Sequence, residues 1–186
     1  MLSRLFSRKG KVDTIAPFLY GVIVAQARSP ALYSDFSVAD TVSGRFEMVV
    51  LHLMLISRRL QSGGEPARKV GQDVFDHFCR DMDKSLRELG VGDLSVPKHM
   101  RRVGEAYYGR AKAYEPGLST ANSEALAEAV ARTVFPDDSQ PEAAIGLAAY
   151  AVAAAGRLEK QDENEIIAGK PDFPQVEDFA PEGVTR

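Results

Sequence analysis

Three histidines and one cysteine are the residues of this chain best suited to acid–base, nucleophilic or metal chemistry. His52, His77 and His99 fall on three different predicted helices, and Cys79 follows His77 by two positions. Residues two apart on a helix point to different sides, so this pair does not place a base beside a nucleophile. The sequence also has no glycine-rich phosphate loop, no G-x-S-x-G and no H-E-x-x-H. We therefore expect no catalytic residues, no metal site and no cofactor, and a protein that is not an enzyme.

Two polar residues are predicted to have structural roles. His52 lies within the apolar run MVVLHLMLI, residues 48–56, where a neutral, buried and hydrogen-bonded histidine is expected. The alternative is a helical haem- or ligand-binding protein that uses His52, which a haem titration would test. Asp81 borders the apolar face of its predicted helix, so its carboxylate needs a partner.

A cluster of cations opens the predicted helix over residues 95–113. Lys98, Arg101 and Arg102 lie in its first turns, where each positive charge opposes the helix dipole at a cost of about 0.3–1 kcal/mol. Local stability therefore does not explain the cluster. It either pairs with acids of the preceding helix or forms a surface for an acidic partner, anionic lipid or, in an RNA-binding module, RNA. The residues predicted to bind a partner are Lys98, Arg101, Arg102, Tyr108 and Arg110.

The elements that position these residues are predicted to be helices. Apolar residues recur at three- and four-residue intervals, and no useful length of sequence alternates like a β strand. We expect an all-α fold, a compact bundle of about six helices. The predicted helices span approximately residues 14–27, 42–61, 67–89, 95–113, 123–135 and 139–158.

The two ends of the chain differ in charge from its middle. Residues 1–12 carry four bases and no acid, and we predict a flexible basic arm there. Residues 13–158 are predicted to form the helical domain. Residues 159–186 contain eight acids and three prolines, which predicts an acidic, extended tail. Three apolar residues of this tail are expected to be able to dock onto the domain: Ile166, Ile167 and Phe173.

The composition of the chain limits the cellular compartments and the classes of binding partner that we expect for the protein. The 186 residues carry a net charge of −3, so overall charge does not favour a nucleic-acid partner, and we expect no DNA binding. The single cysteine excludes an internal disulfide and is compatible with a reducing compartment. No apolar run approaches the roughly 20 residues that span a bilayer. The sequence thus predicts a cytoplasmic protein, with peripheral contact at the inner membrane as a further possibility.

Several segments, taken in order, resemble the ubiquinol–cytochrome c chaperone family. The resemblance covers residues 17–158, and it depends on the order and spacing of the segments together. The segments are LYGVIVAQAR (19–28), VSGRFEM (42–48) with Leu51-His52, Phe75, DMD (81–83), LRELGVGDL (86–94) with VPK (96–98), and AYYGR (106–110) with Tyr114.

This resemblance implies a non-enzymatic assembly factor for respiratory complex III, ubiquinol–cytochrome c reductase. Members of the family associate with newly made cytochrome b, work with a second assembly factor and can sit near the ribosome exit. The chain does not show the long N-terminal extension of mitochondrial members, so it resembles a bacterial member. The resemblance implies that the cluster of Lys98, Arg101 and Arg102 contacts a client, anionic lipid or the ribosome.

Overall fold

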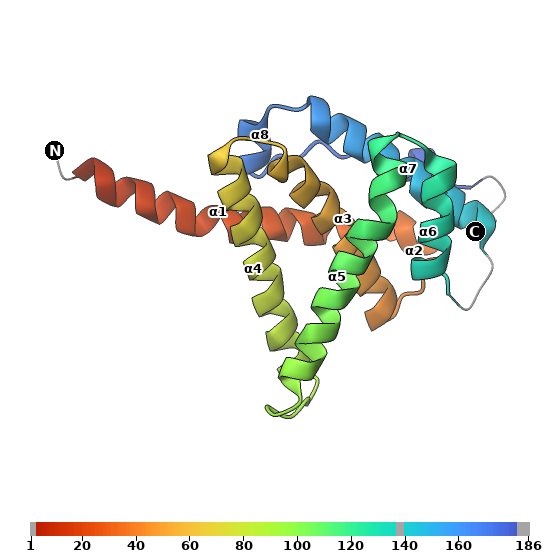
Figure 1. Cartoon of the computed structure of the whole chain (residues 1–186), viewed down its shortest axis with the longest axis horizontal. Coiled ribbons are helices and arrows are strands. Elements are labelled where there is room, and N and C mark those ends of the chain that lie inside the picture. Colours follow the sequence, from red (N-terminus) through yellow and green to blue (C-terminus); the bar gives the residue numbers. More distant parts are fainter. Residues whose placement is uncertain (1–2, 137–139, 182–186) are drawn as a thin grey trace.

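The computed structural model describes residues 3–136 and 140–181, which form eight α helices, one 3₁₀ helix and no β strand (Figure 1). The all-α prediction is confirmed. The helices are α1 (Ser3–Ala27), α2 (Pro30–Ser34), α3 (Val42–Gln61), α4 (Glu65–Glu88), α5 (Val96–Ser119), α6 (Ser123–Val134), α7 (Pro141–Lys160) and α8 (Glu163–Ile167), followed by the 3₁₀ helix η1 (Val176–Phe179).

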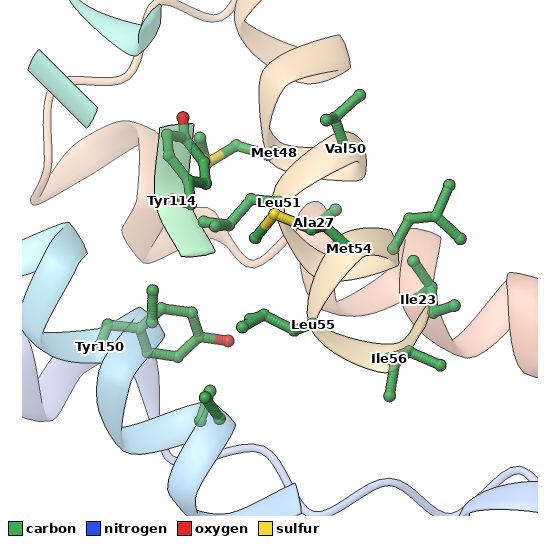
Figure 2. Close-up of a cluster of buried hydrophobic side chains, with 14 of the residues drawn as sticks. Ile23, Ala27, Met48, Val50, Leu51, Met54, Leu55, Ile56, Tyr114 and Tyr150 are labelled. Atoms are coloured by element: carbon green, nitrogen blue, oxygen red, sulfur yellow. The ribbon is translucent and has the colours of Figure 1, made fainter. Parts of the chain in front are cut away.

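Helix α3 is the centre of the hydrophobic core. Its apolar run, residues 48–56, is buried on nearly all sides, as expected for a helix that is hydrophobic all round. Figure 2 shows side chains radiating from α3 in several directions, with Met48 and Leu51 towards Tyr114 and Leu55 towards Tyr150. The helix begins where the Thr41 side chain accepts a hydrogen bond from the Gly44 backbone N–H at 3.2 Å.

Helix α7 completes the core with small residues. It packs against α6 and α3, and its alanines are buried along most of its length. Gly146 lies at a close approach, because a Cβ there would come within 2.6 Å of the Phe179 carbonyl oxygen. The prediction of a helix that ends near residue 158 is confirmed, whereas residue 139, where the helix was predicted to begin, lies outside the described residues.

Helices α4 and α5 form a hairpin whose closed end projects from the bundle (Figure 1). The chain reverses through residues 89–95, where Gly90 has a φ of +83°, a conformation that favours glycine. Helix α5 is longer than predicted, since it continues through Pro116 to Ser119. Proline removes one hydrogen bond, but Gly117 and Leu118 are buried in the bundle and hold the last turn in place.

The two chain ends have more helix than the sequence predicted. A flexible arm was expected over residues 1–12, whereas α1 already begins at Ser3. Over residues 3–12 only Gly10 strongly disfavours a helix, so nothing separates this stretch from the predicted helix. The tail was expected to be extended, yet it contains α8 and η1. Its prolines limit the length of these helices without excluding them.

The tail also packs onto the bundle. Ile166 and Val176 are buried, and the Phe173 ring meets the His52 ring edge-on at a centroid distance of 5.5 Å. The expectation that apolar residues of the tail dock is therefore confirmed for Ile166 and Phe173. Among the described residues no helix combines the length and hydrophobicity needed to cross a bilayer.

Candidate functional site

A groove of about 790 Å³ lies between the hairpin and helices α1 and α3. Its walls come from the C-terminal half of α1, the start of α3, the second half of α4 and the first half of α5. The side chains that line it are mainly apolar, and most of these are only partly buried, so they remain accessible. The partly buried apolar side chains of the lining include Val24, Phe46, Val49, Met82, Leu86 and Val103.

A hydrogen bond ties together two walls of the groove. The Tyr20 hydroxyl on α1 donates to a carboxylate oxygen of Asp81 on α4 at 2.9 Å. Burial and then this bond raise the pKa of Tyr20, so the phenol stays protonated. The prediction that Asp81 needs a partner is confirmed, and the bond fixes α1 against α4 beside the apolar surface.

Arginines outnumber acids in the lining of the groove. Arg28, Arg45 and Arg102 contribute to it, against the acids Asp81 and Glu88. The Arg45 guanidinium donates to Asp40 at 2.6 Å, whereas Arg28 and Arg102 have no ion pair among the described residues. The groove therefore combines an apolar interior with cations that are free to meet an acidic group.

The predicted cation cluster lies at the projecting end of the hairpin. Lys98, Arg101 and Arg102 are all exposed, and only Arg102 lines the groove. Arg101 forms an exposed pair with Glu105 at 3.4 Å, which contributes little to stability. Lys98, like Arg102, has no ion-pair partner in the part of the chain that the structure describes.

The acids of α4 do not neutralise this cluster. Asp83 accepts from Arg87 at 2.7 Å, and Glu88 lies 3.6 Å from Lys84, both at i,i+4 within α4. The Asp81 carboxylate accepts a hydrogen bond from the Tyr20 hydroxyl. Of the two explanations left open by the sequence, pairing with the preceding helix therefore fails for Lys98 and Arg102. A surface for an external partner remains.

Tyr108 is exposed but does not line the groove. Its ring lies 6.0 Å from that of Phe75 and 5.3 Å from that of Tyr107, beside a second pocket of about 350 Å³. Tyr107 is buried and Tyr108 is largely exposed, because adjacent side chains on a helix point about 100° apart. A partner-binding role for Tyr108 stays a prediction, on a different surface from the groove.

Arg110 differs from the other predicted partner-binding residues. Its guanidinium donates to both carboxylate oxygens of Glu47, at 2.6 and 3.0 Å, and the Glu47 side chain is only 8% exposed. These bonds raise the pKa of Arg110 further above its usual value. We therefore correct its assignment: Arg110 is a structural partner of a buried acid and joins α5 to α3.

His52 lies at the centre of a buried network. Nδ1 donates to the Met48 carbonyl at 2.7 Å, while Nε2 accepts from the Tyr150 hydroxyl at 2.8 Å, which in turn accepts from the Gln26 amide at 3.1 Å. Complete burial lowers the pKa of His52 to about 4, so the ring is neutral. With both ring nitrogens occupied, no lone pair is available to a haem iron, which argues against the haem-binding alternative.

Metal and thiol chemistry find no support in the described residues. They contain no cluster of three or more His, Cys, Asp or Glu side chains that could hold a metal ion. Cys79 is half-buried, and burial raises the pKa of its thiol, which disfavours the reactive thiolate.

The groove itself was not predicted from the sequence. Tyr20 on α1, Arg28 just after it and Arg45 on α3 are far from the cation cluster in sequence, and only the packing of the helices brings them to one site. Val42 and Leu89 are apolar residues at helix ends, and the structure shows them 73% and 66% exposed in the lining of the groove.

Comparison with known proteins gives a family and a structural relative. A family model described as ubiquinol–cytochrome C chaperone matches residues 34–173. The fold is similar to the crystal structure of the Cbp3 homolog from Brucella abortus, with a TM-score of 0.86 and 36% sequence identity. That match covers 95% of this chain and 98% of the other. No match was found among curated proteins. Together these findings support an assembly chaperone role, and the groove and its cations are the features of this chain that such a role can use.

Proposed function

Because the chain belongs to the ubiquinol–cytochrome c chaperone family, we propose that it binds newly made cytochrome b during assembly of respiratory complex III. The binding takes place at the cytoplasmic face of the membrane, without catalysis. The observation that carries this proposal is the apolar groove of about 790 Å³ with unpaired cations around it.

The groove has the form of a helix-binding surface. An amphipathic or apolar helix can lay one face against Val49, Met82 and Val103, as in other helix-in-groove complexes. The hydrophobic client that the family resemblance implies would supply such a helix. An acidic residue beside the bound face would meet Arg28 or Arg102, which gives the interaction orientation as well as affinity.

A chaperone must also release its client. The side chains that line the groove are partly exposed in the free protein, so binding buries apolar surface without first unfolding the bundle. Salt and competing charges weaken the electrostatic attraction between these cations and an acidic residue of the client. An open, positively bordered groove therefore suits reversible capture of a hydrophobic segment.

Substitution of the groove tests the proposal. In a strain that lacks the gene, we expect the wild-type chain to restore assembled complex III and to recover cytochrome b on affinity purification from membranes. Leu86→Glu with Val103→Glu places two charges in the groove and should abolish both, since each charge must be desolvated against the client. Ile145→Glu, an exposed apolar position on α7, is the matched control.

Two results would contradict the proposal. One is normal complex III in the strain that lacks the gene. The other is full recovery of cytochrome b by the folded double variant, with circular dichroism used to establish that the variant retains its helices.

A further inference from the structure

The closed end of the α4–α5 hairpin carries the most exposed large apolar side chain of the described residues. Leu94 is 99% exposed and Leu89 66% exposed, and both lie where the hairpin reverses, away from the bundle (Figure 1). Two leucines in water at a projecting end are not explained by the core, because neither is buried by another element. We define this hairpin tip as residues 89–95 with the cations of the first turns of α5.

Unpaired positive charge follows these leucines in the first turns of α5. Lys98 and Arg102 have no ion pair among the described residues, and Arg101 is engaged only with the exposed Glu105. The nearby acids are neutralised by α4 instead: Asp93 accepts a hydrogen bond from Arg87, and Glu88 lies 3.6 Å from Lys84. The excess charge that the tip presents is therefore positive.

The shape of the tip distinguishes the kinds of partner. A protein partner is usually met by a concave or flat surface, whereas Leu94 lines none of the pockets described above and stands on a projecting reversal. Projecting apolar side chains with cations behind them suit the surface of an anionic bilayer, where leucines enter the acyl boundary and cations stay at the headgroups.

We propose that the hairpin tip is a membrane-docking element, in which Leu89 and Leu94 insert into an anionic lipid surface and Lys98, Arg101 and Arg102 contact the headgroups. The inference rests on the proposed action at the membrane and names the surface responsible. Since Leu89, Arg102 and His99 also line the groove, docking would hold the groove next to the bilayer, where an apolar client segment emerges.

The absence of tryptophan from the chain makes a direct test possible. Leu94→Trp supplies a single reporter at the tip, and Ile145→Trp supplies one at an exposed apolar position on α7. With phosphatidylcholine–phosphatidylglycerol vesicles, we expect the emission of the tip tryptophan to shift to the blue and to be quenched by brominated lipid. The α7 tryptophan should show neither change.

Vesicle co-sedimentation measures separately what the cations and the leucines of the hairpin tip contribute to lipid binding. Lys98→Gln with Arg102→Gln should lower partitioning onto anionic vesicles by about 25-fold, since each cation contributes about fivefold. Leu89→Ser with Leu94→Ser should lower it by about tenfold or more. Lys112→Gln, an exposed cation on α5 away from the tip, should have little effect.

Three outcomes would overturn the inference. The first is a protein that does not bind anionic vesicles. The second is vesicle binding during which the tryptophan at position 94 stays exposed to water, which would assign the contact to another surface. The third is salt-dependent RNA binding that requires Lys98 and Arg102 while lipid binding does not. Lys98→Gln and Leu94→Ser, at positions that do not line the groove, should still recover cytochrome b in detergent, which tells these outcomes apart from failure of the proposed client binding.

Discussion

The buried network around His52 and the cation cluster of the α4–α5 hairpin use polar side chains in opposite ways. Around His52 both ring nitrogens and the Tyr150 hydroxyl have partners within 3.1 Å, and burial keeps the ring neutral. In the hairpin, Lys98 and Arg102 have no ion pair among the described residues. Polar groups that are fully partnered hold the fold together, whereas those left unpaired are available to another molecule.

The largest effect should come from the ion pair that joins the two regions. Arg110→Ala leaves the buried Glu47 carboxylate without its partner, so we expect a loss of about 3 kcal/mol in the free energy of unfolding. Lys112→Ala, two positions away and exposed, should change it by no more than about 0.5 kcal/mol. Urea denaturation measures both. Equal, small losses would mean that Arg110 belongs with the unpaired cations after all.

Acid should weaken the buried region through His52. The folded pKa of about 4 lies below the usual 6.5, so the unfolded state binds the proton more tightly. Stability due to the neutral ring is therefore complete above the unfolded pKa and is lost as the pH falls towards the folded pKa. From pH 7 to pH 5 the loss should be about 2 kcal/mol.

His52→Gln removes this titrating group, so the free energy of unfolding should fall by about 2 kcal/mol less between pH 7 and pH 5 than in the wild-type protein. Urea denaturation of both proteins at a series of pH values makes the comparison. Parallel curves for the two proteins would show that His52 titrates as a solvated histidine and that the neutral assignment is wrong.

The bond between Tyr20 and Asp81 should have a smaller effect. Tyr20→Phe removes the donor that satisfies the Asp81 carboxylate, and we expect a loss of about 1 kcal/mol. Tyr108→Phe makes the same chemical change at an exposed ring and should be close to neutral. If both variants unfold at the same urea concentration, the bond does not contribute to holding α1 against α4.

The smallest effect on stability is expected in the cation cluster. Lys98→Glu, Arg101→Glu and Arg102→Glu together replace cations by acids near the N-terminus of α5, so stability should stay unchanged or rise by about 0.5 kcal/mol. Capture of cytochrome b or binding to anionic vesicles should nevertheless be lost. Reduced helicity in circular dichroism would show that the cluster is structural.

The sequence predicted those features that depend on neighbours along one helix. The apolar run on α3 indicated burial, the border position of Asp81 indicated a need for a partner, and the helix dipole indicated that local stability does not explain the cations near the start of α5. Each of these arguments uses only helical spacing or the helix dipole.

Features that depend on contacts between distant helices could not be predicted in this way. Arg110 and Glu47 are 63 residues apart, so neither helix reveals that the other supplies a counter-charge. The groove forms where the hairpin meets α1 and α3, and no local pattern encodes the angles between these helices. Docking of the tail through Ile166 was expected from its apolar residues, but its helices α8 and η1 were not, because its charge and prolines indicated an extended segment.

Site-specific photo-crosslinking in native membranes tests the central claim that the groove holds the client. A photoreactive amino acid replaces Val49 or Val103 in the groove, and Ile145 on α7 serves as the control. We predict an adduct with cytochrome b from both groove positions and none from position 145. An adduct from position 145 with none from the groove, or no adduct from any position, would contradict the account.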